Sequence, residues 1–155
     1  YGPADNYDYQ NSHVMAALIR KFVEAKINNF RYVSCWGTGS PLREFLHVND
    51  LANSVRFVLE NWDPCKQKFL TKDNKDLFYL NVGTGKDITI KELALKIASK
   101  VGFKGEIKWD NTKPDGTPKK QLDISRITKL GWRPTISLDE GIETTIKSFK
   151  EEYKL

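Results

Sequence analysis

The chain has 155 residues, of which 39% are hydrophobic and 29% charged, with a formal net charge of +5 and a sequence pI near 9.1. This length predicts one domain with a real core, and no run approaches the ~20 apolar residues of a membrane span. A basic chain can bind nucleic acid, but these Lys and Arg residues are dispersed among 20 acids. A smaller anionic ligand suits that pattern equally well.

The cysteine and histidine content excludes several kinds of site. Cys35 and Cys65 lie far apart and form no CxxC pair, and His13 and His47 are the two histidines. These residues predict no disulfide framework and no metal site, and they fit a reducing compartment. The first residues are polar and turn-like rather than a signal peptide, and the chain does not start with methionine. We therefore expect a piece of a longer, cytoplasmic chain.

Apolar spacing predicts the first helix after an irregular stretch, residues 1–10. Asn11-Ser12 supplies a helix cap, and the helix runs over 13–26. Its apolar face is formed by Val14, Leu18, Phe22 and Ala25. Arg20 and Lys21 are adjacent on this helix and point about 100° apart. Only one of them can face a given ligand.

Two strand-like runs, 31–36 and 45–48, surround a turn of Gly37-Thr38-Gly39-Ser40-Pro41. Glycine tolerates the positive φ that ends a strand sharply. Trp36 and Arg43 stand on the two sides of this turn, where an indole face and a guanidinium can hold a planar ring and a phosphate. The alternative is structural: the indole caps a core, and the guanidinium pairs with a nearby carboxylate.

A second helix follows this unit and leads to a third strand. Asn49-Asp50 predicts its cap, the helix ends near residue 61, and its apolar face is formed by Leu51, Val55, Val58 and Leu59. A lysine-rich surface loop over 63–76 and a strand over 77–82 come next. Gly83-Thr84-Gly85-Lys86 resembles part of a phosphate loop, but Asp87 stands where that motif needs Ser or Thr. A strand-to-helix turn is therefore favoured here.

Two capping boxes mark the helices of the C-terminal part. The first capping box, Thr89 with Glu92, predicts the start of a helix that ends at Gly102. The second, Ser137 with Glu140, predicts the start of a final helix that runs to about residue 153. A short strand over 106–109 and a short helix over 123–130 lie between them. Because strands alternate with helices, the predicted fold class is α/β.

The segment Lys113-Pro114-Asp115-Gly116-Thr117-Pro118-Lys119-Lys120 is a second unusual loop. Pro-Asp-Gly followed by Thr-Pro forces turns, so Asp115 and the lysine pair face solvent or a ligand. Without further information an ordinary exposed turn is the preferred interpretation.

Taken together and in order, several of these motifs resemble the GDP-L-fucose synthase family of the extended short-chain dehydrogenase/reductase (SDR) superfamily. The resemblance runs essentially from end to end of the chain. The motifs that carry it are Tyr1-Gly2-Pro3, Asp5-Asn6, Ser12-His13-Val14, Trp36-Gly37-Thr38-Gly39, Leu42-Arg43-Glu44-Phe45-Leu46-His47-Val48, Asn81-Val82-Gly83-Thr84-Gly85, Lys113-Pro114-Asp115-Gly116-Thr117-Pro118 and Leu130-Gly131-Trp132.

The resemblance implies that residues 1–155 are the C-terminal, substrate-binding part of such an enzyme, with elements that complete a Rossmann sheet. In this family the N-terminal half carries the Gly-rich dinucleotide turn and a Tyr-x-x-x-Lys pair, and neither occurs here. We therefore expect the NADP cofactor (NADPH) to be bound mainly by that half and these residues alone to be inactive. Residues of about 50–82 are expected to pack against it.

The family converts GDP-4-keto-6-deoxy-D-mannose to GDP-L-fucose by 3,5-epimerisation and NADPH-dependent 4-keto reduction. The resemblance implies that His13 is the acid of the epimerisation and also lies near the cofactor. It implies that Lys21, Trp36, Arg43 and Asp115 contact the GDP-sugar, with Lys119 and Lys120 as further phosphate contacts. It also implies a homodimer for the complete enzyme, with no metal, nucleic acid or membrane.

Three other hypotheses remain open from the sequence. The chain can belong to another nucleotide-sugar epimerase or dehydratase, or it can be a module that binds nucleotide sugars without catalysis. A nucleic-acid binder is the most distant, because the chain has no basic block and no interleaved aromatic residues.

Overall fold

The computed structural model describes residues 1–155, which form five helices and seven short strands. In chain order these are α1 (Val14–Ile27), β1 (Tyr32–Trp36), β2 (Leu42–Glu44), α2 (Val48–Asn61), β3 (Phe69–Leu70), β4 (Asp76–Leu77), β5 (Asp87–Thr89), α3 (Ile90–Val101), β6 (Glu106–Asp110), β7 (Lys119–Lys120), α4 (Ser125–Leu130) and α5 (Leu138–Glu152). The predicted α/β class is confirmed.

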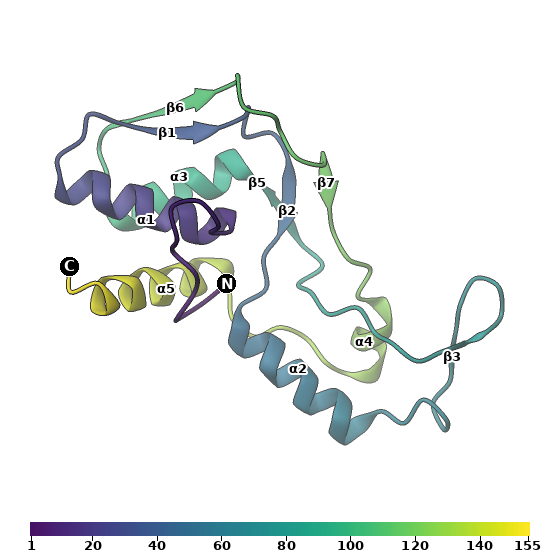
Figure 1. Cartoon of the computed structure of the whole chain (residues 1–155). Coiled ribbons are helices and arrows are strands. Elements are labelled where there is room, and N and C mark those ends of the chain that lie inside the picture. Colours follow the sequence, from purple (N-terminus) through teal and green to yellow (C-terminus); the bar gives the residue numbers. More distant parts are fainter.

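One layered core is built from α1, α3, α5 and the β1–β6 sheet. α1 and α3 lie side by side under the β1–β6 sheet, and α5 packs on α3 (Figure 1). The buried cluster draws mainly on these three helices, and its largest side chains include Phe22, Leu93, Ile97 and Phe149. Burying an aliphatic or aromatic side chain of this size contributes about 1.5–3 kcal/mol, so this cluster is the main source of stability.

Strand register brings distant segments of the chain together beside this core. β1 pairs with β6 in parallel, so Trp36 lies opposite Asp110. β2 is the centre of a second sheet, antiparallel to β5 and parallel to β7. The loop from β6 to β7 therefore returns beside the turn from β1 to β2.

The helices with strong sequence signals form as predicted. Thr89 and Glu92 make both hydrogen bonds of a capping box at α3, and Gly102 ends that helix in the left-handed conformation. At α5 the Ser137 hydroxyl accepts from the backbone N–H of Glu140. α1 also spans the predicted residues, but its N-cap is His13 rather than Asn11-Ser12, and no side chain caps it.

Two predicted strands are wrong or incomplete. The second strand covers Leu42–Glu44 rather than 45–48, because residues 45–47 leave the sheet and lead into α2. The predicted strand over 77–82 is almost entirely irregular: only Asp76–Leu77 forms β4, in a small hairpin with β3. Phe78 and Tyr79, which follow β4, are exposed. A strand needs a neighbour for its backbone hydrogen bonds, and no segment of this chain supplies one.

The cap of α2 also differs from the prediction. His47 is the N-cap, and its Nδ1 accepts from the backbone N–H of Asn49 at 3.2 Å. Burial lowers the pKa of His47, so the neutral ring that can accept this bond is favoured. Asp50 instead reaches across to another segment: its carboxylate accepts from the backbone N–H groups of Thr135 and Ile136 at 3.1 and 3.0 Å.

α2 packs through its polar side and leaves its apolar side uncovered. Asp50 and Ser54 are its buried residues. The exposed apolar side chains are Val48, Leu51, Val55 and Leu59, the last of them 81% exposed. α2 lies apart from the layered core (Figure 1). A stripe of this kind on a helix is normally buried.

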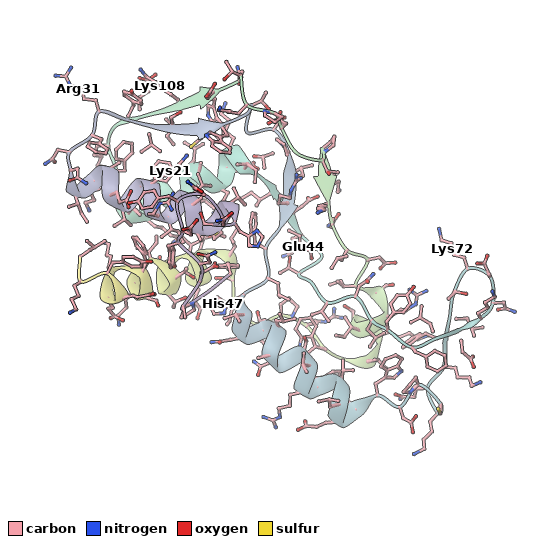
Figure 2. The ribbon with its side chains drawn as sticks, in the orientation of Figure 1. Lys21, Arg31, Glu44, His47, Lys72 and Lys108 are labelled. Atoms are coloured by element: carbon pink, nitrogen blue, oxygen red, sulfur yellow. The ribbon has the colours of Figure 1, made fainter.

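Glu44, at the end of β2, joins three segments of the chain (Figure 2). Its Oε1 accepts from the backbone N–H of Gly85 at 2.6 Å, and its Oε2 accepts from that of Leu122 at 2.9 Å. A Cβ added to Gly83 would collide with the same carboxylate. The Gly83–Lys86 segment thus binds a carboxylate of its own chain, through the backbone N–H of Gly85 and the hydroxyl of Thr84.

Replacing Glu44 should therefore destabilise the fold more than replacing an exposed glutamate. Glu44→Ala leaves two backbone N–H groups without their charged acceptor, and we expect a loss of about 2–4 kcal/mol in the free energy of unfolding. Glu60→Ala, which removes only an exposed pair with Arg56, should cost under about 1 kcal/mol. Urea denaturation of both variants in the complete protein measures the difference, and equal losses would contradict the role of Glu44.

Candidate functional site

The turn after β1 and the loop after β6 are joined by one carboxylate. Asp115 Oδ1 accepts from the backbone N–H of Thr38 at 2.9 Å, and its Oδ2 accepts from the Thr38 hydroxyl at 2.6 Å. These two bonds hold the pKa of Asp115 below its usual value. Gly37 and Gly39 both have positive φ, as the turn prediction requires. The loop is thus ordered rather than a free surface turn.

Trp36 stands at the edge of this junction with its indole largely in solvent. The residue is 68% exposed, so the alternative in which it caps a core is wrong. The Nζ atoms of Lys21 and Lys113 lie 5.8 and 5.7 Å from its ring centroid. Cations at this distance are attracted to the indole face, so two ammonium groups gather around one exposed ring.

Lys21 reaches this ring from α1, and its neighbour Arg20 does not. The Lys21 Nζ donates to the backbone carbonyl of Ser34 on β1 at 2.9 Å, and Figure 2 shows it between α1 and the sheet. Arg20 is buried against the N-terminal stretch, where Nη1 donates to the Tyr7 carbonyl and the guanidinium lies 4.0 Å from the Tyr9 ring centroid. The expectation that only one of the two faces a ligand is consistent with this arrangement.

Arg43 approaches the same junction from β2. Its Nη1 donates to the neighbouring Leu42 carbonyl at 2.7 Å, and it makes no ion pair, so the alternative of pairing with a carboxylate is wrong. A Cβ added to Gly116 would lie 2.9 Å from its Nη2. The guanidinium is therefore beside the loop that carries Asp115. Lys21, Arg43 and Lys113 have no carboxylate within ion-pair distance. By contrast, Lys96 and Lys100 of α3 form ion pairs with acids of α5.

The two predicted lysines of the second loop, Lys119 and Lys120, differ in their ion pairing. Lys119 Nζ pairs with Asp87 Oδ2 at 3.1 Å, so its charge is already balanced. Lys120 lies opposite Arg43 in the β2–β7 register and is exposed without a salt bridge. Only Lys120 therefore leaves its charge available beside Arg43.

His13 is an exposed residue at the start of α1. Its side chain makes no cap bond, and the first turn of α1 contains no acid. A side chain free of internal bonds, at a helix end with positive partial charge, fits a contact with an anionic cofactor. The chain offers this one fitting residue and no Gly-rich dinucleotide turn, so these residues would form only a minor part of a nicotinamide-cofactor site.

Sequence reasoning did not single out two residues of this site, Thr38 and Lys113. Both stood inside motifs that were noticed, but their roles depend on a contact between segments 77 residues apart. A hollow of about 720 Å³ lies elsewhere, between β5, α3 and the start of α5, and none of the predicted site residues lines it. The structure contains no group of three or more His, Cys, Asp or Glu side chains arranged to hold a metal. No helix combines the length and apolarity that a membrane crossing requires.

Comparison with known proteins agrees with the motifs. Residues 1–69 match the family described as NAD dependent epimerase/dehydratase family. The chain is 48% identical over 151 residues to the probable GDP-L-fucose synthase 1 of Oryza sativa subsp. japonica, and 47% identical over 151 residues to the GDP-L-fucose synthase of Escherichia coli (strain K12). Each match covers 97% of this chain. The chain is a homologue of the GDP-L-fucose synthases. The predicted resemblance is confirmed.

These relatives are more than twice as long as the chain, which covers 42% and 46% of their lengths. Solved structures show the same fold. A GDP-6-OMe-4-keto-L-xylo-heptose reductase from C. jejuni superposes with a TM-score of 0.84 at 35% identity, covering 98% of this chain and 51% of that one. MlghC, a GDP-mannoheptose C4 reductase from Campylobacter jejuni with NADP bound, gives 0.79 at 32% identity, covering 97% and 50%.

The contact between the turn and the loop leaves no room for a side chain at Gly37. An added Cβ would collide with Asp115 Oδ1, and the residue has φ +73°. Gly37→Ala should therefore cost about 1–3 kcal/mol and release the loop. Gly131→Ala is a matched control: φ is +111° there, but the nearest atom to the added Cβ is 3.9 Å away. Limited proteolysis between residues 111 and 118 should accelerate only in Gly37→Ala, and equal rates would contradict the contact.

Proposed function

We propose that residues 1–155 are the C-terminal, substrate-binding part of a GDP-L-fucose synthase. The complete enzyme would convert GDP-4-keto-6-deoxy-D-mannose to GDP-L-fucose by 3,5-epimerisation and NADPH-dependent 4-keto reduction. One observation carries this proposal: Lys21, Trp36, Arg43 and Asp115 come from four separate segments and gather around one turn. The homology to GDP-L-fucose synthases supports the choice of substrate.

The proposed contacts follow from the chemistry of each side chain. Arg43 and Lys21 pair with the diphosphate, since neither cation has a carboxylate partner within the chain and charge-assisted bonds to phosphate are strong. Trp36 packs its exposed indole on a ring of the ligand. Asp115, kept ionised by Thr38, accepts hydrogen bonds from the guanine or the ribose. Lys120 is a further phosphate contact beside Arg43.

His13 is proposed as the acid of the epimerisation. Inverting a carbon next to a ketone requires a base on one face and an acid that returns a proton on the other. An exposed imidazole with no internal hydrogen bond is free to donate that proton. Bound NADPH supplies the hydride for the ketone reduction. His13 is also proposed to contact this cofactor, most of whose site would lie in residues outside this chain.

The exposed side of α2 is proposed to pack against the Rossmann part of the complete enzyme. Its uncovered apolar stripe and the irregular 78–82 segment both lack a neighbour here. The chain spans less than half the length of its relatives, which leaves ample residues to cover them.

The homodimer stays a prediction. Another GDP-sugar enzyme is the second candidate, because the C. jejuni reductase named above acts on a GDP-heptose and shares 35% identity.

Replacing Arg43 or Lys21 by alanine in the complete protein should weaken GDP binding by about 10- to 100-fold. Each substitution removes a charge-assisted bond of about 1.5–3 kcal/mol. Lys72→Ala is the matched control, because this exposed lysine lies in the β3–β4 hairpin, far from the turn (Figure 2). Titration calorimetry with GDP and UDP measures the effect. Wild-type binding of UDP as tight as GDP would overturn the GDP-sugar assignment.

Leu59→Asp in the complete protein tests the packing of α2. If the apolar stripe is covered, the buried charge should lower the free energy of unfolding by at least about 2 kcal/mol. Asn53→Asp places the same side chain on the opposite side of the helix and should change it by under about 0.5 kcal/mol. Thermal denaturation of both variants compares the two sides. Equal melting temperatures would mean that the stripe remains in solvent.

A further inference from the structure

We propose that Thr38 is a positioning residue that aims Asp115 at a pair of adjacent hydrogen-bond donors on the nucleotide. This inference rests on the proposed function, because it assumes that Asp115 contacts the ligand. It adds a residue, Thr38, that the sequence motifs did not single out. It also names the kind of ligand group from which Asp115 accepts hydrogen bonds.

Thr38 holds both oxygens of the carboxylate at once. Its backbone N–H donates to Oδ1 at 2.9 Å and its hydroxyl donates to Oδ2 at 2.6 Å. The rotation of the carboxylate about its own axis is thereby fixed. Gly37, directly before Thr38, lets the Asp115 carboxylate come close to the turn, since a Cβ added to Gly37 would collide with Oδ1. Thr38 is fixed in turn by Ser40, whose Oγ lies 2.7 Å from the Thr38 Oγ1.

The arrangement leaves a defined acceptor. An ionised carboxylate has about four lone-pair sites on two oxygens, and Thr38 uses one on each. One remaining site on each oxygen can accept from a ligand, and Asp115 is exposed to solvent. Two acceptors fixed side by side match two donors fixed side by side. In a guanine nucleotide such pairs occur on the guanine edge, as N1–H with the 2-amino group, and on the ribose, as the 2′- and 3′-hydroxyls.

The position of Asp115 supports an outward role rather than fastening alone. Its neighbour Gly116 lies against Arg43, which has no carboxylate partner. On the other side the loop begins at Lys113, which lies by the exposed Trp36. A carboxylate that served only to fasten the loop would not need to stand between two unpaired cations and a bare indole.

Five variants of the complete protein test the inference. Thr38→Val removes the hydroxyl at nearly constant volume, and Thr38→Ser keeps it. Thr117→Val removes an exposed hydroxyl of the 113–118 loop that makes no hydrogen bond to Asp115 or Thr38. Asp115→Asn, alone and combined with Thr38→Val, completes a double-mutant cycle. The readouts are GDP affinity by calorimetry, KM and kcat with the GDP-sugar, and the melting temperature.

We expect Thr38→Val to weaken GDP binding about tenfold, or ~1.4 kcal/mol, and to raise KM while kcat stays within a factor of about two. Thr38→Ser and Thr117→Val should bind within about twofold of wild type. In the Asp115→Asn background, Thr38→Val should have no further effect. A loss that adds in full to that of Asp115→Asn, or one that follows the melting temperature across all variants, would overturn the positioning role.

Two analogues identify the donor pair. Inosine diphosphate lacks the 2-amino group and 2′,3′-dideoxy-GDP lacks both ribose hydroxyls, so wild type should discriminate against one of them and Thr38→Val should lose that discrimination. Equal binding of both analogues and GDP by wild type would overturn the two-donor assignment. If wild type binds no GDP at all, the proposed function itself fails. If it binds GDP and Thr38→Val binds equally well, only this inference fails.

Discussion

Carboxylates that accept hydrogen bonds from distant backbone N–H groups hold this chain together outside its core. Glu44 ties β2 to the Gly83–Lys86 segment and to Leu122, Asp50 ties α2 to residues 135–136, and Asp115 ties the 113–118 loop to Thr38. The strands involved are too short to align these segments by ladders alone. A charged acceptor makes shorter and stronger bonds than a neutral one. One acid can therefore hold an irregular segment in place where no strand pairing does so.

The site depends on this mode of fastening. Trp36 ends β1 and Arg43 is in β2, but each is separated from Asp115 by more than 70 residues of sequence. The β1–β6 and β2–β7 pairings bring the two ends of the loop into place, and the Asp115–Thr38 contact closes it. A site built in this way has polar side chains held by hydrogen bonds, although none of these side chains is buried. Ligand contacts can then form with little ordering of the loop, which reduces the entropic cost of binding.

Sequence alone was sufficient where signals are local. Apolar spacing placed α1, capping residues placed α3 and α5, and glycines with positive φ placed the turn after β1. It was insufficient where a residue serves a distant segment. Asp50 resembles a helix cap in sequence, yet its carboxylate is used by residues 135–136, and His47 takes the cap. The predicted strand over 77–82 has good strand composition but no partner here, and composition cannot supply one. Thr38 was hidden for the same reason, because its partner lies 77 residues away.

The candidate site gathers cations that make no ion pair within the chain. Some cations elsewhere on the surface are paired, such as Lys96 and Lys100 with Asp139, Lys68 with Asp76, and Lys119 with Asp87. Around the turn, Lys21, Arg43 and Lys113 make no ion pair, and the Asp115 carboxylate is bound by Thr38. A net charge of +5 spread evenly would attract anions weakly everywhere. Two of these cations lie within 6 Å of the exposed Trp36 ring centroid. A diphosphate attached to flat rings would find cations and a stacking surface together there.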